Sequence, residues 1–304
     1  MTDDPNWPRA SAWLAGDHDP EPGATLQMIG APVRLGSISG GRFDLAPTAV
    51  RSSFERFSTW DGAGHDVRAV RVRDAGDLAI ADKTAAEATD EIAGAVGGSL
   101  PHSDAVMLLG GDNSITRPGV RGLGTDLERV GLLTLDAHHD LRDTAGGLTN
   151  GNPVRALVED GLPGINIFQV GIQAFANSRA YAEVASDLGI DVVTAEEARS
   201  GDGVAAAVAS ALDHLDRRAD VIYVDLDVDV LDRAFAPACP GSRPGGLAPW
   251  ELQAAARVCG EHPKVRAIDF VEVDPERDVA EATVMTVASL VLAFSAGLCR
   301  RSSA

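Results

Sequence analysis

Cysteine, lysine and tyrosine are scarce in this chain of 304 residues, which contains three, two and two of them respectively. The cysteines (Cys239, Cys259 and Cys299) lack the close spacing of a metal finger, and their odd number does not indicate a disulfide framework. Basic residues are also few, because 26 lysines and arginines face 45 acids and leave a net charge of −19. Such acidity argues against partners that are nucleic acids or anionic membranes.

Targeting and membrane segments are missing from the sequence pattern as well. Residues 1–16 are acidic and interrupted by proline, unlike a signal peptide. The longest apolar stretch, residues 284–298, is interrupted by hydroxyl side chains and is short for a membrane span. We therefore expect a cytoplasmic protein whose C-terminal apolar stretch is a buried helix.

Apolar β-type runs alternate with helical patterns along most of the chain. Several runs are apolar throughout, as expected when helices cover both faces of a parallel sheet. The predicted fold class is therefore α/β, a three-layer α/β/α sandwich with a mostly parallel central sheet. The predicted strands cover residues 26–29, 69–72, 105–109, 130–135, 165–170, 191–193, 221–227 and 265–271. The predicted helices cover residues 47–57, 84–96, 181–188, 204–215 and 249–258.

The pattern predicts one catalytic domain over residues 24–304, preceded by a loosely ordered N-terminal extension over residues 1–23. Ligands of open α/β sheets bind beyond the carboxyl ends of the strands. Polar clusters that directly follow an apolar run are therefore the candidate sites.

Two such clusters are rich in carboxylates. Asp136, His138, His139 and Asp140 follow the strand predicted at residues 130–135. Burying so many polar groups at a strand end is costly unless a cation compensates them. Aspartates at strand ends also serve as turn formers and helix caps, and this cluster alone is compatible with that role.

A second predicted strand leads into Asp225, Asp227 and Asp229, which share one face by period-2 alternation. Carboxylates so close together repel one another at low dielectric unless cations lie between them. With Asp136 and Asp140, Asp227 and Asp229 would balance two divalent ions. Oxygen ligands with one imidazole suit Mn²⁺, and two such ions would lower the pKa of a shared water.

Four motifs in this order resemble the ureohydrolase (arginase/agmatinase) superfamily. They are GGDNS at residues 110–114, DAHHD at 136–140, VDLDVDVLD at 224–232, and Glu272 within DFVEVDPERD. The family pattern is GGDH, DAHxD and SxDxDxxD followed by a late glutamate. The likeness extends from about residue 35 to the end, and it implies an arginase-like fold and a homo-oligomer, trimeric or hexameric.

The resemblance also implies a role for each metal-site residue. Asp136 and Asp227 would bridge the two ions, while Asp140 and Asp229 would complete one site each. His138 would bind the second ion.

Catalytic roles follow from the same resemblance. Asp140 would orient the attacking hydroxide and handle its proton, and Glu272 would hold the amidine nitrogens of the substrate. A carboxylate suits the latter role because an amidinium presents paired N–H donors. His139 is a candidate proton relay, although a histidine beside a metal site is more often a packing residue.

Two positions depart from the family pattern. Asn113 replaces the GGDH histidine that binds the first metal, and an amide oxygen is a weaker donor than imidazole towards transition metals. Asn150 stands where arginases and agmatinases have a histidine that shuttles protons. Because asparagine does not titrate, this proton relay is absent.

The residues after DAHHD indicate the substrate. The reading DAHHDLRD resembles formimidoylglutamases, which commonly lack the shuttle histidine as well. Arg142 and Arg155 flank this loop and would bind the two carboxylates of N-formimino-L-glutamate, with Asn150 and Asn152 as further substrate contacts. The implied reaction yields L-glutamate and formamide, a late step of histidine catabolism.

Other interpretations remain open. The arginines could be surface residues or ion-pair partners. The substrate could be agmatine, guanidinobutyrate or arginine, with release of urea. From a different class, the chain could be a non-catalytic arginase-fold scaffold whose metal site is impaired by Asn113.

Overall fold

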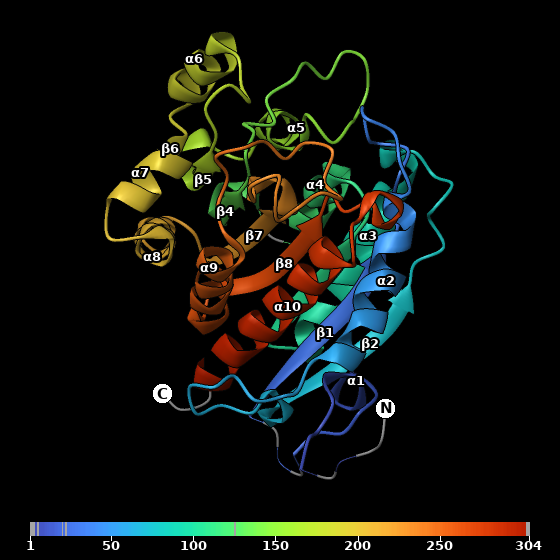
Figure 1. Cartoon of the computed structure of the whole chain (residues 1–304). Coiled ribbons are helices and arrows are strands. Elements are labelled where there is room, and N and C mark those ends of the chain that lie inside the picture. Colours follow the sequence, from blue (N-terminus) through green and yellow to red (C-terminus); the bar gives the residue numbers. More distant parts are fainter. Residues whose placement is uncertain (1–3, 5, 20, 22, 125, 302–304) are drawn as a thin grey trace.

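The computed structural model describes residues 4, 6–19, 21, 23–124 and 126–301, and its centre is a single sheet (Figure 1). Eight parallel strands are arranged in the order β2-β1-β3-β8-β7-β4-β5-β6. They are β1 (Ala24–Ala31), β2 (Val70–Asp77), β3 (Ala105–Gly110), β4 (Val130–Leu135), β5 (Ile167–Ile172), β6 (Asp191–Thr194), β7 (Val221–Asp227) and β8 (Val265–Val271). All eight predicted strands are present, β4, β7 and β8 with the predicted bounds and the other five with shifted ends, so the predicted fold class is confirmed.

Ten α-helices connect and cover the strands in the described part of the chain. They are α1 (Ala10–Leu14), α2 (Ala46–Ser53), α3 (Ala85–Ser99), α4 (Thr116–Arg121), α5 (Pro153–Asp160), α6 (Arg179–Leu188), α7 (Ala195–Ser200), α8 (Val204–Asp216), α9 (Pro249–Glu261) and α10 (Ala282–Arg301). The five predicted helices correspond to α2, α3, α6, α8 and α9. The pattern missed α4 because its sequence, TRPGVR, contains both proline and glycine and has no apolar period.

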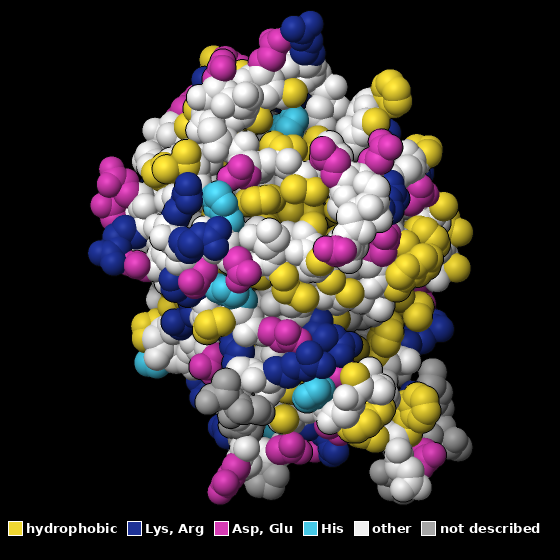
Figure 2. Space-filling view, turned by 90° about the vertical axis from the view of Figure 1, so that its left-hand side faces the viewer, with side chains coloured by type: hydrophobic (Ala, Val, Ile, Leu, Met, Phe, Trp, Pro, Cys, Tyr) yellow, Lys and Arg dark blue, Asp and Glu magenta, His cyan; other side chains and the backbone are white. Residues whose placement is uncertain are grey.

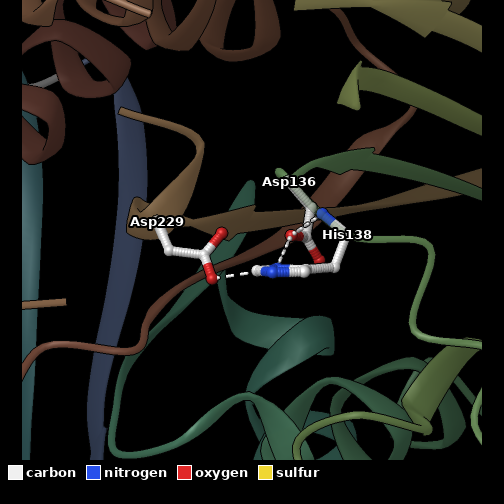
Figure 3. A group of neighbouring side chains, drawn as sticks. All are labelled: Asp136, His138 and Asp229. Atoms are coloured by element: carbon white, nitrogen blue, oxygen red, sulfur yellow. Dashed lines mark hydrogen bonds and ion pairs between the residues drawn. The ribbon is translucent and has the colours of Figure 1, made fainter. Parts of the chain in front are cut away.

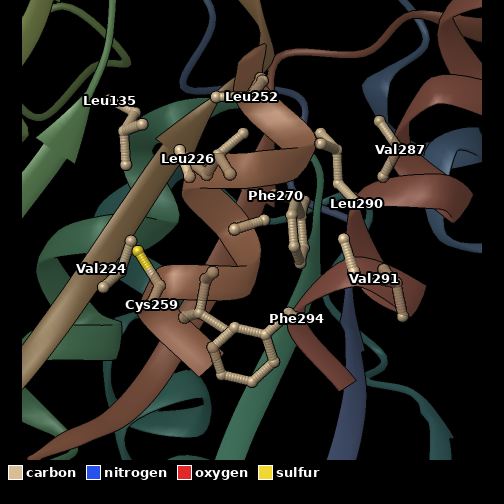
Figure 4. Packing of buried hydrophobic residues seen from close by; sticks show 14 of the residues in the cluster. Leu135, Val224, Leu226, Leu252, Cys259, Phe270, Val287, Leu290, Val291 and Phe294 are labelled. Carbon is tan, nitrogen blue, oxygen red and sulfur yellow. The ribbon is translucent and has the colours of Figure 1, made fainter. Parts of the chain in front are cut away.

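The helices form two layers, one on each face of the sheet. One apolar core lies under α2, α8, α9 and α10, and a second lies under α3, α4, α5 and α6. Within the first core, Phe294 of α10 and Cys259 of α9 pack beside Phe270 of β8 (Figure 4). A Cβ atom on Gly260 would lie 2.1 Å from the Phe294 carbonyl oxygen, so glycine allows α9 and α10 to approach closely.

Helix α10 is long and apolar enough to cross a membrane, with a mean hydropathy of 1.9. However, 78% of its apolar window is buried inside the fold, against α9 and the sheet. This burial confirms the expected C-terminal core helix.

The N-terminal segment before the sheet contains a helix that the sequence pattern did not predict. In α1, Trp13 is fully buried, and its Nε1 donates a hydrogen bond of 2.9 Å to the backbone oxygen of Val70. Its ring also meets Phe54 edge to face. This part of the segment predicted to be loosely ordered is therefore packed onto the domain, while residues 1–3, 5, 20 and 22 lie outside the described residues.

The side of the molecule that carries α6, α7 and α8 has a mixed surface. Acidic and basic side chains are interspersed among apolar ones there (Figure 2). The charges on this face therefore do not gather into one large patch of either sign.

Strand order places the candidate site. The neighbouring strands β3, β8, β7 and β4 lie in the middle of the sheet, and their carboxyl ends lead into the GGDNS loop, Glu272, the Asp227–Asp229 segment and the DAHHD loop. Because the strands are parallel, these four segments meet at one edge.

Candidate metal centre and active site

The acids after β7 are positioned by a tight turn. Strand β7 ends at Asp227, whose Oδ1 accepts a hydrogen bond of 2.8 Å from the backbone N–H of Asp229 and caps a single 3₁₀ turn. Asp229 is therefore not part of an extended strand, and the predicted period-2 alignment of Asp225, Asp227 and Asp229 is wrong beyond Asp227. The Asp225 carboxyl group is buried, and its residue lies in register with Asp269 of the neighbouring strand β8.

Asp136, His138 and Asp229 form the tightest group (Figure 3). Their potential ligand atoms all lie within 4.8 Å of one another. The Nδ1 atom of His138 lies 3.0 Å from Asp229 Oδ2 and 3.4 Å from Asp136 Oδ1. The DAHHD loop and the β7 turn thus supply one imidazole and two carboxylates to one point.

Asp140 and Glu272 have strained backbones, with φ angles of +53° and +68°. Side chains other than glycine rarely adopt this left-handed region, and such strain is often found at functional sites. Asp140 and Asp227 are both buried beside the group of Figure 3. The backbone strain is compatible with a functional placement of the Asp140 and Glu272 carboxylates.

Burial without enough positive charge raises the pKa values of several acids in this cluster. It raises the pKa of Asp136 to about 6, with a further contribution from Asp229. Burial also raises the pKa values of Asp140 and Asp227 well above their usual range. Conversely, the carboxylate of Asp229 raises the pKa of His138 to about 12, so the imidazole takes up a proton between the acids.

These groups fit divalent cations. A buried proton on His138 and neutral carboxyl groups are what a cluster of acids adopts when the compensating positive charge is missing. Hard oxygen donors with one imidazole are the ligand set expected for such ions. Gly241 adds a close wall, since a Cβ atom there would lie 1.9 Å from Asp229 Oδ2 and 3.2 Å from His138 Cε1.

Asn113 lies in the same buried cluster but turns its nitrogen towards the acids. Its Nδ2 donates a hydrogen bond of 2.6 Å to Asp140 Oδ2, and its Oδ1 accepts one of 2.7 Å from Thr116 Oγ1. In this orientation the amide oxygen, the atom that could bind a metal, is engaged by Thr116. The predicted role of Asn113 as a ligand would require the amide to turn over.

Asn150 holds Glu272 and the loop at the rim of the site. Its Nδ2 donates a hydrogen bond of 2.9 Å to Glu272 Oε1, and its Oδ1 accepts one of 3.0 Å from the backbone N–H of Ile38. The backbone N–H of Asn113 donates to the same Glu272 oxygen at 2.8 Å. Asn150 is therefore a positioning residue in this structure, where the sequence predicted a substrate contact.

Burial raises the pKa of Glu272 to about 8, and the charge of Asp112 contributes to this shift. The hydrogen bonds from Asn113 and Asn150 oppose the shift because they favour the charged form. Glu272 is thus poised to lose its proton when a cation approaches.

A cavity of about 290 Å³ opens over this cluster. It brings together the predicted residues His138, Asp140, Arg142, Asn150, Asp227, Asp229 and Glu272. It is also lined by residues that sequence reasoning missed, namely Asn177, Tyr181, Gly241 and Arg243. No local motif marks Asn177 and Tyr181, whose approach to the cavity depends on the strand order. Gly241 and Arg243 lie in the segment APACPGSRPGGL, which follows VDLDVDVLD and belongs to the same family resemblance, but no role was predicted for them.

Five predicted site residues do not line this cavity. Asn113 and Asp136 contact the lining residues Asp140 and His138 instead, and the other three make structural contacts. Arg155 forms an ion pair of 2.8 Å with Glu159, one helical turn away. Asn152 is buried and bonds only within its own loop, accepting from the backbone of Thr149. These contacts replace the predicted substrate contacts with structural ones.

His139 is the last of the five. Its Nδ1 lies 2.7 Å from Gln169 Oε1 of β5, and its ring lines a separate cavity under α6. Burial lowers the pKa of His139. The structure supports the packing role, and the predicted proton relay at this position is wrong in geometry.

Buried carboxylates around one imidazole, at the carboxyl edge of a parallel α/β sheet and under an open cavity, define a metal-dependent hydrolase. Comparison with known proteins agrees. The arginase family profile matches residues 24–296. Formimidoylglutamase from Halalkalibacterium halodurans is 35% identical over 280 residues, which cover 90% of this chain and 88% of that protein. The chain belongs to the arginase family.

Solved structures show the same likeness. The crystal structure of formimidoylglutamase from Bacillus subtilis superposes with a TM-score of 0.89 at 29% identity, over 98% of this chain and 94% of that one. Formiminoglutamase from Trypanosoma cruzi, solved with Mn²⁺, shares the fold with a TM-score of 0.85 at 22% identity, over 97% and 99% of the two chains.

Proposed function

We propose that the protein is a formimidoylglutamase, which hydrolyses the formimino C–N bond of N-formimino-L-glutamate to L-glutamate and formamide. The observation that carries this proposal is a cavity lined by carboxylates and by two arginines, Arg142 and Arg243. The carboxylates suit a hydrolytic metal centre and an amidine, and the arginines suit a substrate with two carboxylates. The 35% identity to a formimidoylglutamase supports the same substrate.

Two divalent cations, which we propose to be Mn²⁺, would supply the chemistry of lowering the pKa of a water molecule and polarising the substrate. Their proposed ligands are the carboxylates and imidazole of the cluster: Asp136, His138, Asp140, Asp227 and Asp229. Asn113 would act as a weak ligand of the first ion only after its amide turns over.

Glu272 is proposed to bind the amidine group of the substrate. Its Oε1 is occupied by the N–H groups of Asn113 and Asn150, whereas Oε2 has no hydrogen-bond partner among the described residues. An anionic Oε2 can accept a charge-assisted hydrogen bond from an amidinium N–H. This contact would place the formimino carbon over the acid cluster.

Asp140 is proposed to manage the proton. Its carboxylate would orient the attacking water and accept a proton as oxygen bonds to the formimino carbon. The same proton would then pass to the glutamate nitrogen as the C–N bond breaks. The leaving group departs as an amine, and the carbon, with its remaining nitrogen, becomes formamide.

We also infer a role in histidine catabolism in the cytoplasm and a homo-oligomeric assembly, trimeric or hexameric. The family resemblance supports both. Size-exclusion chromatography with light scattering would test the assembly, and a monomer at micromolar concentration would contradict it.

The decisive experiment is reconstitution with Mn²⁺ followed by assay of N-formimino-L-glutamate against agmatine, guanidinobutyrate and arginine. We expect formamide and glutamate from the first substrate and no urea from the others. Urea from a guanidino compound, without turnover of the formimino substrate, would overturn the proposal. An Asp229→Ala variant is the control, because it should lose both metal and turnover. If neither protein bound metal, the chain would be a scaffold.

A further inference from the structure

Two arginines reach the cavity from different loops. Arg142 follows the DAHHD loop after β4, and Arg243 lies in the loop between β7 and α9. Both side chains are exposed, and neither forms an ion pair with any residue that the structure describes. By contrast, the neighbouring Arg117 and Arg155 are paired with Asp160 and Glu159 respectively. The charges of Arg142 and Arg243 are thus available to an anion in the cavity.

Arg243 is held at the cavity wall beside Gly241, which lies against Asp229 and His138. Its Nη1 donates hydrogen bonds to the carbonyl oxygens of Pro240, Gly241 and Ser242, at 3.2, 2.6 and 3.1 Å. Carbonyl groups orient the guanidinium without cancelling its charge, and the remaining N–H donors stay free for a bidentate partner.

The distance from this guanidinium to the acid cluster is bounded by Gly241. A Cβ atom on Gly241 would lie 1.9 Å from Asp229 Oδ2, and the Gly241 carbonyl accepts from Arg243 Nη1 at 2.6 Å. With standard bond lengths, Arg243 Nη1 therefore lies at most about 9 Å from that carboxylate. The charge is close to the proposed site of the reacting carbon.

Arg142 enters the cavity beside Gly151 and Asn150. A Cβ atom on Gly151 would lie 2.6 Å from Arg142 Cδ and 2.9 Å from its Nε, so the side chain lies directly across this glycine. The adjacent Asn150 extends its whole side chain from here to Glu272. Arg142 thus lies beside the loop that holds Glu272, and glycine at 151 is required for its placement.

We propose that Arg243 binds the α-carboxylate of the substrate and that Arg142 binds its side-chain carboxylate; this assignment rests on the proposed function. The α-carboxylate is attached to the carbon that bears the reacting nitrogen, whereas the other carboxylate is two methylenes further away. The Arg243 guanidinium lies within about 9 Å of the Asp229 carboxylate and is therefore assigned to the carboxylate next to the reacting nitrogen. The Arg142 guanidinium, which enters the cavity from the loop after β4, is assigned to the other carboxylate. Two anchors on separate loops select amidines of dicarboxylic amino acids over guanidines with cationic or neutral tails.

The charge of the site agrees with this selection. With two divalent ions, the five buried carboxylates (Asp136, Asp140, Asp227, Asp229 and Glu272) leave one negative charge. The two arginines turn it into one positive charge. N-formimino-L-glutamate, with an amidinium and two carboxylates, carries one negative charge and is complementary.

The test combines two variants with three substrates. Arg243→Met and Arg142→Met are assayed as Mn²⁺-loaded full-length proteins with N-formimino-L-glutamate, N-formimino-4-aminobutyrate (no α-carboxylate) and N-formimino-L-norvaline (no side-chain carboxylate). A lost bond between charged groups predicts a fall in kcat/KM of roughly 10- to 100-fold. For Arg243→Met, we expect this fall with the glutamate and norvaline derivatives and less than a threefold change with the aminobutyrate derivative. Arg142→Met should spare only the norvaline derivative.

Arg155→Met is the matched control and should leave all three kcat/KM values unchanged, because Arg155 pairs with Glu159. Equal losses on all substrates, or the reverse pattern for the two variants, would overturn the assignment. Calorimetric binding of L-glutamate, 4-aminobutyrate and L-norvaline gives a readout independent of turnover. If wild-type protein binds L-glutamate through both arginines yet does not hydrolyse its formimino derivative, the proposed function fails and the assignment stands. If it neither binds nor hydrolyses these compounds, both fail.

Discussion

At the carboxyl edge of the sheet, five carboxylates are buried around one imidazole, whereas the layer between α9, α10 and β8 buries almost only apolar side chains. In the first region burial raises the pKa values of Asp140 and Glu272, whose backbones are also strained. The second contains Phe294, which is fully buried. The apolar layer therefore stabilises the fold, whereas the acid cluster destabilises it. The following predictions test that division.

The largest effect should come from Asp140→Asn. Loss of the group that handles the proton should lower kcat by about 10²- to 10⁴-fold. In metal-free protein the same change should raise the thermal midpoint, because it removes a buried group that is costly to ionise. Steady-state kinetics and thermal melts in EDTA measure the two effects. An active variant, or one less stable than wild type without metal, would contradict this division.

In the apolar layer, Phe294→Ala should have the opposite profile. Removing a fully buried ring should lower the free energy of unfolding by about 3–5 kcal/mol, while turnover per folded molecule stays near wild type. Urea denaturation measures the loss. The matched control is Val279→Ala, whose side chain is 64% exposed and whose effect should stay within about 0.5 kcal/mol.

Metal removal should make stability fall with rising pH. The folded pKa of Glu272 is raised to about 8, so metal-free folded protein holds a proton that the unfolded chain loses near its usual value. Its contribution is complete below about pH 4.5 and is lost as pH rises to about 8. Melts in EDTA should show a lower midpoint at pH 9 than at pH 6, with a weaker slope in Glu272→Gln. A midpoint that rises with pH would refute the sign.

A smaller effect, a gain in metal affinity, is expected from Asn113→His. Imidazole is the stronger donor, so affinity for the first ion should rise by roughly 10-fold. The variant also loses the bonds to Asp140 and Thr116 and should not gain folding stability in EDTA. Metal content after dialysis against graded Mn²⁺ tests the prediction. Unchanged occupancy would show that Asn113 does not limit this site.

The smallest effect should come from Asn150→Ala. Without its hydrogen bonds to Glu272 and Ile38, the amidine-binding carboxylate and the rim loop lose a partly exposed anchor. We expect kcat/KM to fall by roughly 3- to 10-fold, the worth of about 1 kcal/mol per hydrogen bond. Asn150→Asp, which cannot donate to Glu272, should be at least as impaired. An Asn150→Ala variant as active as wild type would assign Asn150 to loop structure alone.

Prediction from sequence succeeded where one local segment carries the information. The strand runs and the DAHHD loop were recognised because apolar periodicity and adjacent acids are properties of neighbouring residues. It failed for Arg155 and Asn152, because the competing partners Glu159 and Thr149 are equally local and carry no distinguishing pattern. It failed for His139 because Gln169, on another strand, turns the ring away from the cavity.

The sequence by itself determined the α/β class, the parallel sheet and the family, since apolar alternation and motif order are written along the chain. Only the tertiary structure decided which side chains share the cavity. Glu272, Asp229 and Asp140 share the cavity because β8, β7 and β4 are neighbours in the sheet. That order results from the packing of whole helices and strands, and such long-range contacts leave no trace in the spacing of neighbouring residues.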